Sequence, residues 1–130
     1  MTKRKIFLLI PLVIAAGLLI YCWTIILSTD TLATWRHYVG LGLFLILTFF
    51  YFKSFKLTIV GTGIYLLLAT FNVLSMTAQI STSWLRIGPI ETPPVQLLSL
   101  GLFILFAILN FDTLVDIYLD YKEAKQVKAK

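Results

Sequence analysis

The sequence predicts an all-α integral membrane protein, a bundle of four membrane helices with both termini in the cytoplasm. Three observations carry this prediction: the composition, the four apolar runs, and the placement of the basic residues. Of the 130 residues, 59% are hydrophobic and 13% are charged, and the mean hydropathy is +0.93. Soluble domains average about 45–50% apolar and about 25% charged residues. The chain is also short enough to form one transmembrane domain, residues 1–130.

Each apolar run is expected to be one membrane span, because about 20 apolar residues cross a hydrocarbon core of about 30 Å. The first run is too long for a signal-peptide core and has no small-residue cleavage site after it, so we expect it to be retained. The fourth opens with "TPPVQ", where Thr92 is the predicted N-cap and Pro93 or Pro94 lies in the first turn. The expected spans are residues 6–27, 36–53, 57–76 and 94–112.

The basic residues are distributed unequally over the segments that connect these spans. Nine of the eleven Lys and Arg residues lie in the N-terminus, the turn between spans two and three, and the C-terminal tail. The two other loops hold only Arg36 and Arg86. This asymmetry predicts cytoplasmic termini and a plasma membrane location, the inner membrane in a bacterium. The net charge of +5 does not indicate nucleic-acid binding, because the cations border apolar runs, where lipid headgroups lie.

The stretch "TWRHYVG" opens the second span and contains the only histidine of the chain. Tryptophan and tyrosine concentrate at membrane interfaces because their rings are amphipathic. The sequence therefore predicts an outer interface anchor, in which His37 reaches lipid phosphate or caps the helix. An alternative makes His37 a proton-handling or ligand-binding group with Asp30 or Glu91. The predicted anchor residues are Trp23, Trp35, Arg36, His37 and Trp84.

Polar residues inside the spans need partners and therefore report on helix packing. Asn72 in span three and Gln96 in span four lie at matching depth, so we expect them to share a contact, directly or through one water. Asn110 is the third predicted interhelical polar residue. Spacings of three and four indicate two matching packing seams. They are Gln96, Ser99, Phe103, Phe106 and Asn110 on span four, and Thr62, Tyr65, Ala69, Asn72 and Met76 on span three, with Gly61 and Gly63 allowing close approach.

The tail, residues 112–130, is expected to continue span four as one helix into the cytoplasm. Its three aspartates recur every four positions, with Glu123 three residues further, and form one face, roughly opposite an aromatic face. The acidic face is either simply solvated or pairs Asp112 or Asp116 with Lys53 or Lys56. A third possibility is that the aromatic face binds a cytoplasmic protein. The predicted interaction face is Asp112, Asp116, Tyr118, Asp120 and Tyr121.

The loop 77–94 is too polar to span, and "IGPI" signals a turn. We expect a short hairpin or irregular cap lying on the outer end of the bundle, with Trp84, Leu85 and Ile87 dipping toward lipid.

Two function classes follow from these features. The first is a non-catalytic membrane or accessory subunit that acts through helix packing and its tail, with a membrane or cytoplasmic protein as partner. The second is a small homo-oligomeric channel or membrane-permeabilising protein, lined by Thr48, Asn72, Gln96 and Asn110. No charged residue lies deep in a span, and the motifs of metal, phosphate and serine chemistry are missing from the sequence. The sequence therefore predicts neither an enzyme nor a cofactor.

Overall fold

The computed structural model describes residues 3–30, 32–78, 86–87, 89–91 and 94–128. Its elements are four helices and one small β-hairpin. The helices are α1 (Lys3–Ser28), α2 (Trp35–Lys53), α3 (Phe55–Thr70) and α4 (Leu97–Lys128). The hairpin pairs β1 (Arg86–Ile87) with β2 (Ile90–Glu91) in antiparallel fashion. The all-α membrane fold class predicted from the sequence is confirmed, and α1, α2 and α4 are long and apolar enough to cross a membrane.

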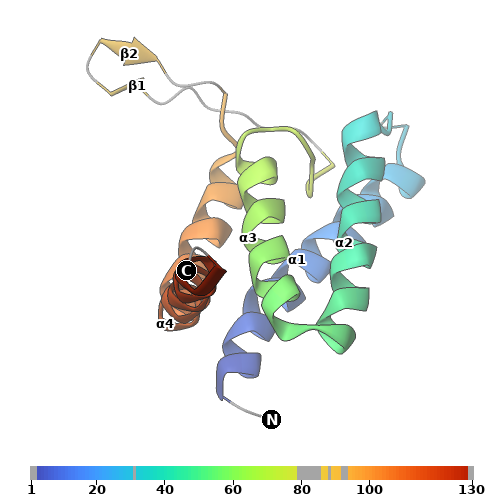
Figure 1. Cartoon of the computed structure of the whole chain (residues 1–130). Coiled ribbons are helices and arrows are strands. Elements are labelled where there is room, and N and C mark those ends of the chain that lie inside the picture. Colours follow the sequence, from blue (N-terminus) through green and yellow to red (C-terminus); the bar gives the residue numbers. More distant parts are fainter. Residues whose placement is uncertain (1–2, 31, 79–85, 88, 92–93, 129–130) are drawn as a thin grey trace.

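Helix α3 is the centre of the bundle. It packs most extensively against α4 and α2, and α1 crosses behind it to reach α4 (Figure 1). The glycines of α3 allow both close approaches. A side chain at Gly63 would meet the Phe106 ring of α4 at 3.2 Å, whereas one at Gly61 would meet Leu47 of α2 at 2.6 Å. The two glycines predicted to allow close approach therefore do so toward two different helices.

Helices α2 and α3 are joined by the single residue Ser54. Its extended backbone is at once the C-cap of α2 and the N-cap of α3. The Ser54 N–H donates to the carbonyl of Phe50 (2.7 Å), and its carbonyl accepts from the N–H of Thr58 (3.0 Å). One residue thus satisfies terminal groups of both helices and forces them into a tight antiparallel pair.

The predicted third span is wrong in its extent, because α3 ends at Thr70 and does not continue to residue 76. Asn72 has φ = 60°, in the left-handed region. The N–H of Asn72 donates to Ala69 (3.1 Å) and the N–H of Val73 donates to Leu68 (2.9 Å). This is the Schellman arrangement, in which the residue after the C-cap takes a left-handed conformation and ends the helix. With 16 residues α3 is about 24 Å long, less than a full hydrocarbon core.

The predicted start of the fourth span is also wrong. Helix α4 begins at Leu97, and its first intrahelical bond runs from the N–H of Leu100 to the carbonyl of Gln96 (2.9 Å). Gln96 rather than Thr92 is therefore the N-cap. Its own N–H is held by the carbonyl of Thr70 at the end of α3 (3.0 Å), which fixes the chain in a non-helical conformation at this point. Thr92 and Pro93 lie outside the described residues.

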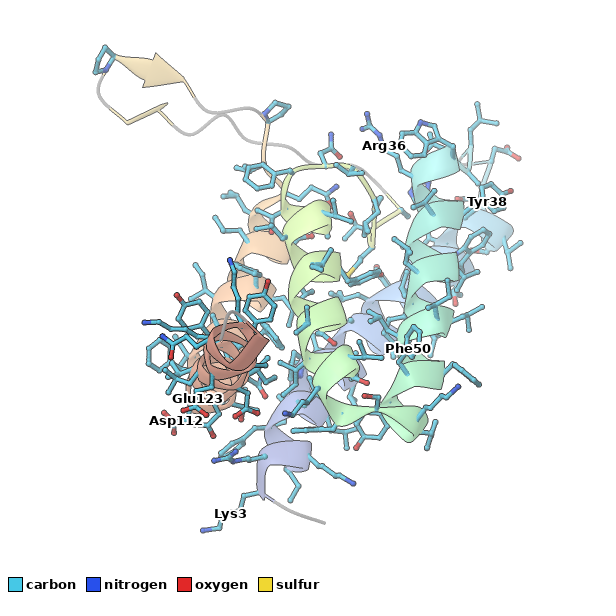
Figure 2. All side chains as sticks on the ribbon, in the orientation of Figure 1. Lys3, Arg36, Tyr38, Phe50, Asp112 and Glu123 are labelled. Carbon is cyan, nitrogen blue, oxygen red and sulfur yellow. The ribbon has the colours of Figure 1, made fainter. Side chains whose placement is uncertain are left out.

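The helix termini define two ends of the molecule. Arg4 of α1 pairs with Asp116 of α4, and Lys56 of α3 pairs with Asp120. These contacts bring the start of α1, the α2–α3 turn and the C-terminal half of α4 together, and we call this the basic end. The opposite end, called the hairpin end, holds the start of α2, the end of α3 and the start of α4. Lys3 and Arg36 mark the two ends (Figure 2).

The predicted hairpin in the 77–94 loop is present. Arg86 lies opposite Glu91 and Ile87 opposite Ile90. It does not lie on the bundle as expected, but extends away from the helices beyond α3 and α4 (Figure 1). The segment that covers this end of the bundle is instead residues 71–78. The expected lipid contacts of Trp84 and Leu85 fall outside the described residues.

Candidate functional site

Polar side chains gather around the 71–78 segment at the hairpin end, and we call this group the end cluster. Its members come from the start of α2, the turn after α3 and the start of α4. They are Thr34, His37, Thr70, Asn72, Ser75, Thr77, Gln96 and Ser99.

Gln96 and Asn72 make the contact expected from their matching depth. The side-chain amide of Gln96 donates to Asn72 Oδ1 (2.8 Å) and to the carbonyl of Leu74 (3.1 Å). Its Oε1 accepts a hydrogen bond from Ser99 Oγ (3.3 Å). Gln96 is only 3% exposed, and both its backbone and its amide serve the turn that follows α3. This contact is therefore a structural bond between α3 and α4.

His37 is buried, with 1% of its surface exposed, so it does not reach lipid phosphate as the anchor prediction proposed. Its Nδ1 accepts the backbone N–H of Thr34 (3.0 Å) and lies 2.9 Å from the hydroxyl of Thr34. Its Nε2 lies 3.0 Å from the carbonyl of Thr77. Because Nδ1 accepts a backbone proton, this network assigns the ring hydrogen to Nε2, which donates to Thr77. His37 thus caps α2 and ties down the 71–78 segment.

The proton-handling alternative for His37 requires a ring nitrogen that is open to a carboxylate partner or a ligand. Both nitrogens are engaged by the main chain or side chain of Thr34 and Thr77. General acid–base work requires a carboxylate or substrate within hydrogen-bond reach. The geometry therefore gives His37 a capping role in this conformation.

The end cluster depends on a close approach of backbone to backbone at Gly40. A side chain here would lie 2.7 Å from the carbonyl oxygen of Ser75. The N–H of Ser75 donates to the carbonyl of Arg36 (3.2 Å), one turn earlier in α2. The carbonyl of Gly40 also accepts from the hydroxyl of Tyr65 (3.2 Å). Leu74, Ser75 and Met76 are fully buried as a result.

The other predicted anchors have different surroundings. Trp35 is 60% exposed, and the Arg36 guanidinium lies 5.7 Å from its ring centroid, an arrangement that suits the membrane interface. Trp23 is half-buried and its ring meets Tyr38 edge-on at 5.3 Å. It therefore packs α1 against α2. Trp84 lies outside the described residues.

Asn110 makes an interhelical contact at the interface of α1 and α4. It is 1% exposed, and its Nδ2 donates to the carbonyls of Phe7 (3.4 Å) and Phe106 (3.1 Å). Pro11 lies inside α1 and has no N–H to give to Phe7, the residue four positions before it. Asn110 supplies the missing donor, as neighbouring helices do for prolines in membrane helices.

The tail interaction face is exposed, and its acidic residues are paired differently from the prediction. Lys56 Nζ contacts Asp120 Oδ2 (2.6 Å) rather than Asp112 or Asp116. Asp116 forms an ion pair with Arg4 instead (2.8 Å). At equal rise from the Thr70–Gln96 contact, Asn110 would lie level with Lys56, so Asp112 would be the nearest carboxylate and Asp120 would lie about two turns beyond it. Helix α4 is inclined to α3, and its C-terminal half runs toward the viewer in Figure 1. This inclination accounts for the shift of two turns.

Two features were missed at the level of sequence. The turn over residues 71–76 falls within the span predicted from the sequence, although Asn is a helix-stop signal when it occupies the position after the C-cap, as Asn72 does. The pairing of Pro11 with Asn110 has no local signal at all. Among the described residues, no group of three His, Cys, Asp or Glu side chains could hold a metal ion.

Comparisons of this chain with protein-family models, with curated proteins and with solved structures give no match. The case for a function therefore rests on the residues themselves.

Proposed function

We propose that this chain is a non-catalytic membrane subunit that binds a partner protein through the cytoplasmic part of α4. The observation that carries the proposal is the length of α4. Its 32 residues extend about 48 Å, whereas a hydrocarbon core is about 30 Å thick. About a dozen residues must therefore project from the membrane.

The projecting part of α4 has two faces with different environments. Asp116 and Asp120 turn toward the bundle, where Arg4 and Lys56 neutralise them. On the other face, Tyr118 is 63% exposed and Tyr121 is 67% exposed. These tyrosines line a shallow hollow together with Lys122, Lys125 and Gln126.

Exposed tyrosines flanked by lysines favour a protein partner of complementary chemistry. Tyrosine is enriched in the energetic centres of protein interfaces, because it combines a large apolar ring with a polar tip. The adjacent lysines select a partner surface that presents an apolar pocket beside acidic side chains.

The proposed orientation places both termini in the cytoplasm. Its support is that the start of α1, the α2–α3 turn and the C-terminal half of α4, which are rich in basic residues, meet at the basic end, while Arg36 lies at the opposite end (Figure 2). The proposed location is the plasma membrane, which is the inner membrane in a bacterium.

The alternative of a homo-oligomeric channel finds less support. Three of the residues that would line its pore, Asn72, Gln96 and Asn110, donate or accept hydrogen bonds inside one chain. The fourth, Thr48, is exposed, but its hydroxyl donates to the carbonyl of Phe44 in its own helix (2.9 Å).

The test is native mass spectrometry of the tagged protein after gentle extraction from its own membrane. We expect a second protein at fixed stoichiometry, which is lost when Tyr118 and Tyr121 are both replaced by alanine. Tyr21→Ala is the matched control, because Tyr21 is 66% exposed but lies in α1, away from the tail. Equal recovery of the partner with the double variant and the control would refute the proposal, and a closed homo-oligomer without a partner would revive the channel.

The orientation is tested separately with reporters fused to the C-terminus. A reporter that is active only in the cytoplasm should be active, and one that requires export should be inactive. The reverse pattern would place the tail outside and remove it from any cytoplasmic partner.

A further inference from the structure

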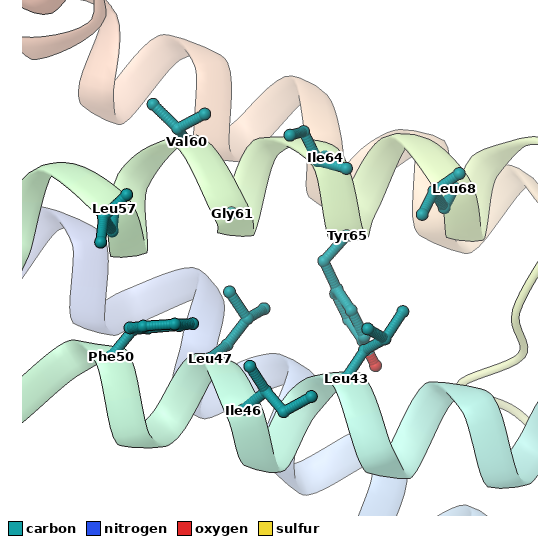
Figure 3. A pocket seen from close by; sticks show the side chains of 10 residues that line it. All are labelled: Leu43, Ile46, Leu47, Phe50, Leu57, Val60, Gly61, Ile64, Tyr65 and Leu68. Carbon is teal, nitrogen blue, oxygen red and sulfur yellow. The ribbon is translucent and has the colours of Figure 1, made fainter.

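An apolar groove runs between α2 and α3, on the side of the pair that Figure 3 presents. It has a volume of about 330 Å³. Leu43, Ile46 and Phe50 line it from α2, and Val60 and Ile64 line it from α3. The one polar atom among its lining side chains, the hydroxyl of Tyr65, is already bonded to the carbonyl of Gly40. The groove therefore offers only hydrocarbon to an occupant.

The groove is elongated and opens to the outside of the helix pair. Its floor is the contact between Gly61 and Leu47, where the two helices touch. From Leu57 to Leu68 it extends about 16 Å along α3. One extended hydrocarbon chain can lie along a slot of this length.

Lys53 stands at one end of the groove. It follows Phe50 by three residues and Ile46 by seven, so it continues the same face of α2 by one turn. Its ammonium lies 5.9 Å from the ring centroid of Phe49. Among the described residues it has no carboxylate partner, whereas neighbouring Lys56 is paired with Asp120. A cation without a carboxylate partner in the described part of the chain thus follows the end of the apolar slot, one turn beyond Phe50.

We propose that this groove is a specific lipid site. It holds one acyl chain of an anionic phospholipid, and Lys53 contacts the phosphate of that lipid. The occupant is a lipid because the slot is lined by hydrocarbon side chains, one of its walls is a candidate membrane span, and a cation without a carboxylate partner among the described residues follows its end. The preference for anionic headgroups follows from the charge of Lys53 in the interfacial region.

The test uses the purified protein in nanodiscs that contain equal amounts of phosphatidylglycerol and phosphatidylethanolamine, followed by native mass spectrometry of the released protein. We expect one retained phosphatidylglycerol per chain. Ile64→Trp fills the groove and should abolish this retention. Ile108→Trp is the matched control, because Ile108 is an exposed membrane residue of α4 outside the groove, and it should retain the lipid as the original chain does. If Ile64→Trp does not fold, Val60→Phe fills the same slot with a smaller change.

Lys53→Gln tests the headgroup contact. The lipid should still bind, but the preference for phosphatidylglycerol over phosphatidylethanolamine should fall about fivefold, the effect of one cation near the surface. Lys3→Gln at the same end should keep the preference. Equal lipid retention by the groove-filling variant and the Ile108 control would overturn the proposal. So would a homodimer that Ile64→Trp abolishes, since a second copy would then occupy the groove.

Discussion

Asn110 on α4 completes the hydrogen bonding that Pro11 leaves open in α1. Its Nδ2 donates to the carbonyl of Phe7, which the proline ring deprives of its helical donor. Both Pro11 and Asn110 are fully buried. The contact thus couples a break in one helix to a polar residue in another.

This relationship predicts a coupling between two substitutions. Asn110→Leu should lower the free energy of unfolding, because the Phe7 carbonyl then lacks a donor in an apolar interface. In a Pro11→Ala background the helix supplies its own donor, so the cost of Asn110→Leu should be smaller. The expected coupling energy is about 0.6 kcal/mol, with an upper range of about 1.7 kcal/mol. Unfolding by SDS titration of the four proteins of the cycle measures it, and additive effects would contradict the assignment.

The left-handed backbone of Asn72 predicts an order of stability among its variants. In Asn72→Gly the backbone can still adopt the left-handed conformation, and only the side-chain contact with Gln96 is lost. Asn72→Ala also loses the contact, and its backbone must still adopt φ near 60°, which costs about 1–2 kcal/mol more. Thermal unfolding in detergent should therefore rank the original chain above glycine and glycine above alanine. An alanine variant as stable as the glycine variant would show that the helix stop is not set by this residue.

Gly40 and Gly42 provide a matched pair on α2. Gly40→Ala places a methyl group 2.7 Å from the Ser75 carbonyl oxygen, so either the 71–78 segment or α2 must shift. Gly42→Ala meets nothing within 4 Å and should be neutral or stabilising by up to about 1 kcal/mol. Melting temperatures of the two variants in detergent test this. Equal effects would mean that the 71–78 segment does not pack against α2.

The hydrogen bonds of His37 predict that its replacement changes amide hydrogen exchange locally. His37→Leu removes two part-buried hydrogen bonds, those to the Thr34 N–H and the Thr77 carbonyl, at a cost of about 0.5–1.5 kcal/mol each. Hydrogen exchange should accelerate in residues 71–78, where the Ser75 N–H is bonded to α2. Trp35→Leu, an exposed position two residues away, should leave this exchange unchanged. Unaltered protection in the His37 variant would show that His37 does not hold the 71–78 segment in place.

The two ion pairs at the basic end predict only small effects. All four side chains are more than half exposed, so solvent and salt screen the pairs Arg4–Asp116 and Lys56–Asp120. Asp116→Asn and Asp120→Asn should each lower stability by less than about 1 kcal/mol, and the difference should vanish at high salt. Denaturant titrations at low and high ionic strength measure both. A larger loss that persists in salt would mean that the carboxylates bind something else.

The candidate site was predictable where depth and spacing decide contacts. Asn72 follows the end of α3 and Gln96 precedes α4 at the same end of the bundle, and an amide in an apolar environment needs a polar partner, so their contact could be expected from counting residues. Capping of α2 was one of the two roles expected of His37, but its burial was not predictable in the same way. Its neighbours in sequence resemble an interface anchor, but Gly40 lets the 71–78 segment close over it, and that segment was expected to be helical.

The sequence by itself determined the fold class, the number of helices and the continuity of α4 into the tail, because apolar content and helical periodicity are local properties of the chain. Tertiary structure decided where α3 stops, which carboxylate meets Lys56 and which residue serves Phe7. Each of these depends on how helices incline and which backbone groups remain unpaired after packing. Such groups find partners across the bundle, and residue spacing along one helix does not encode the position of a donor on another.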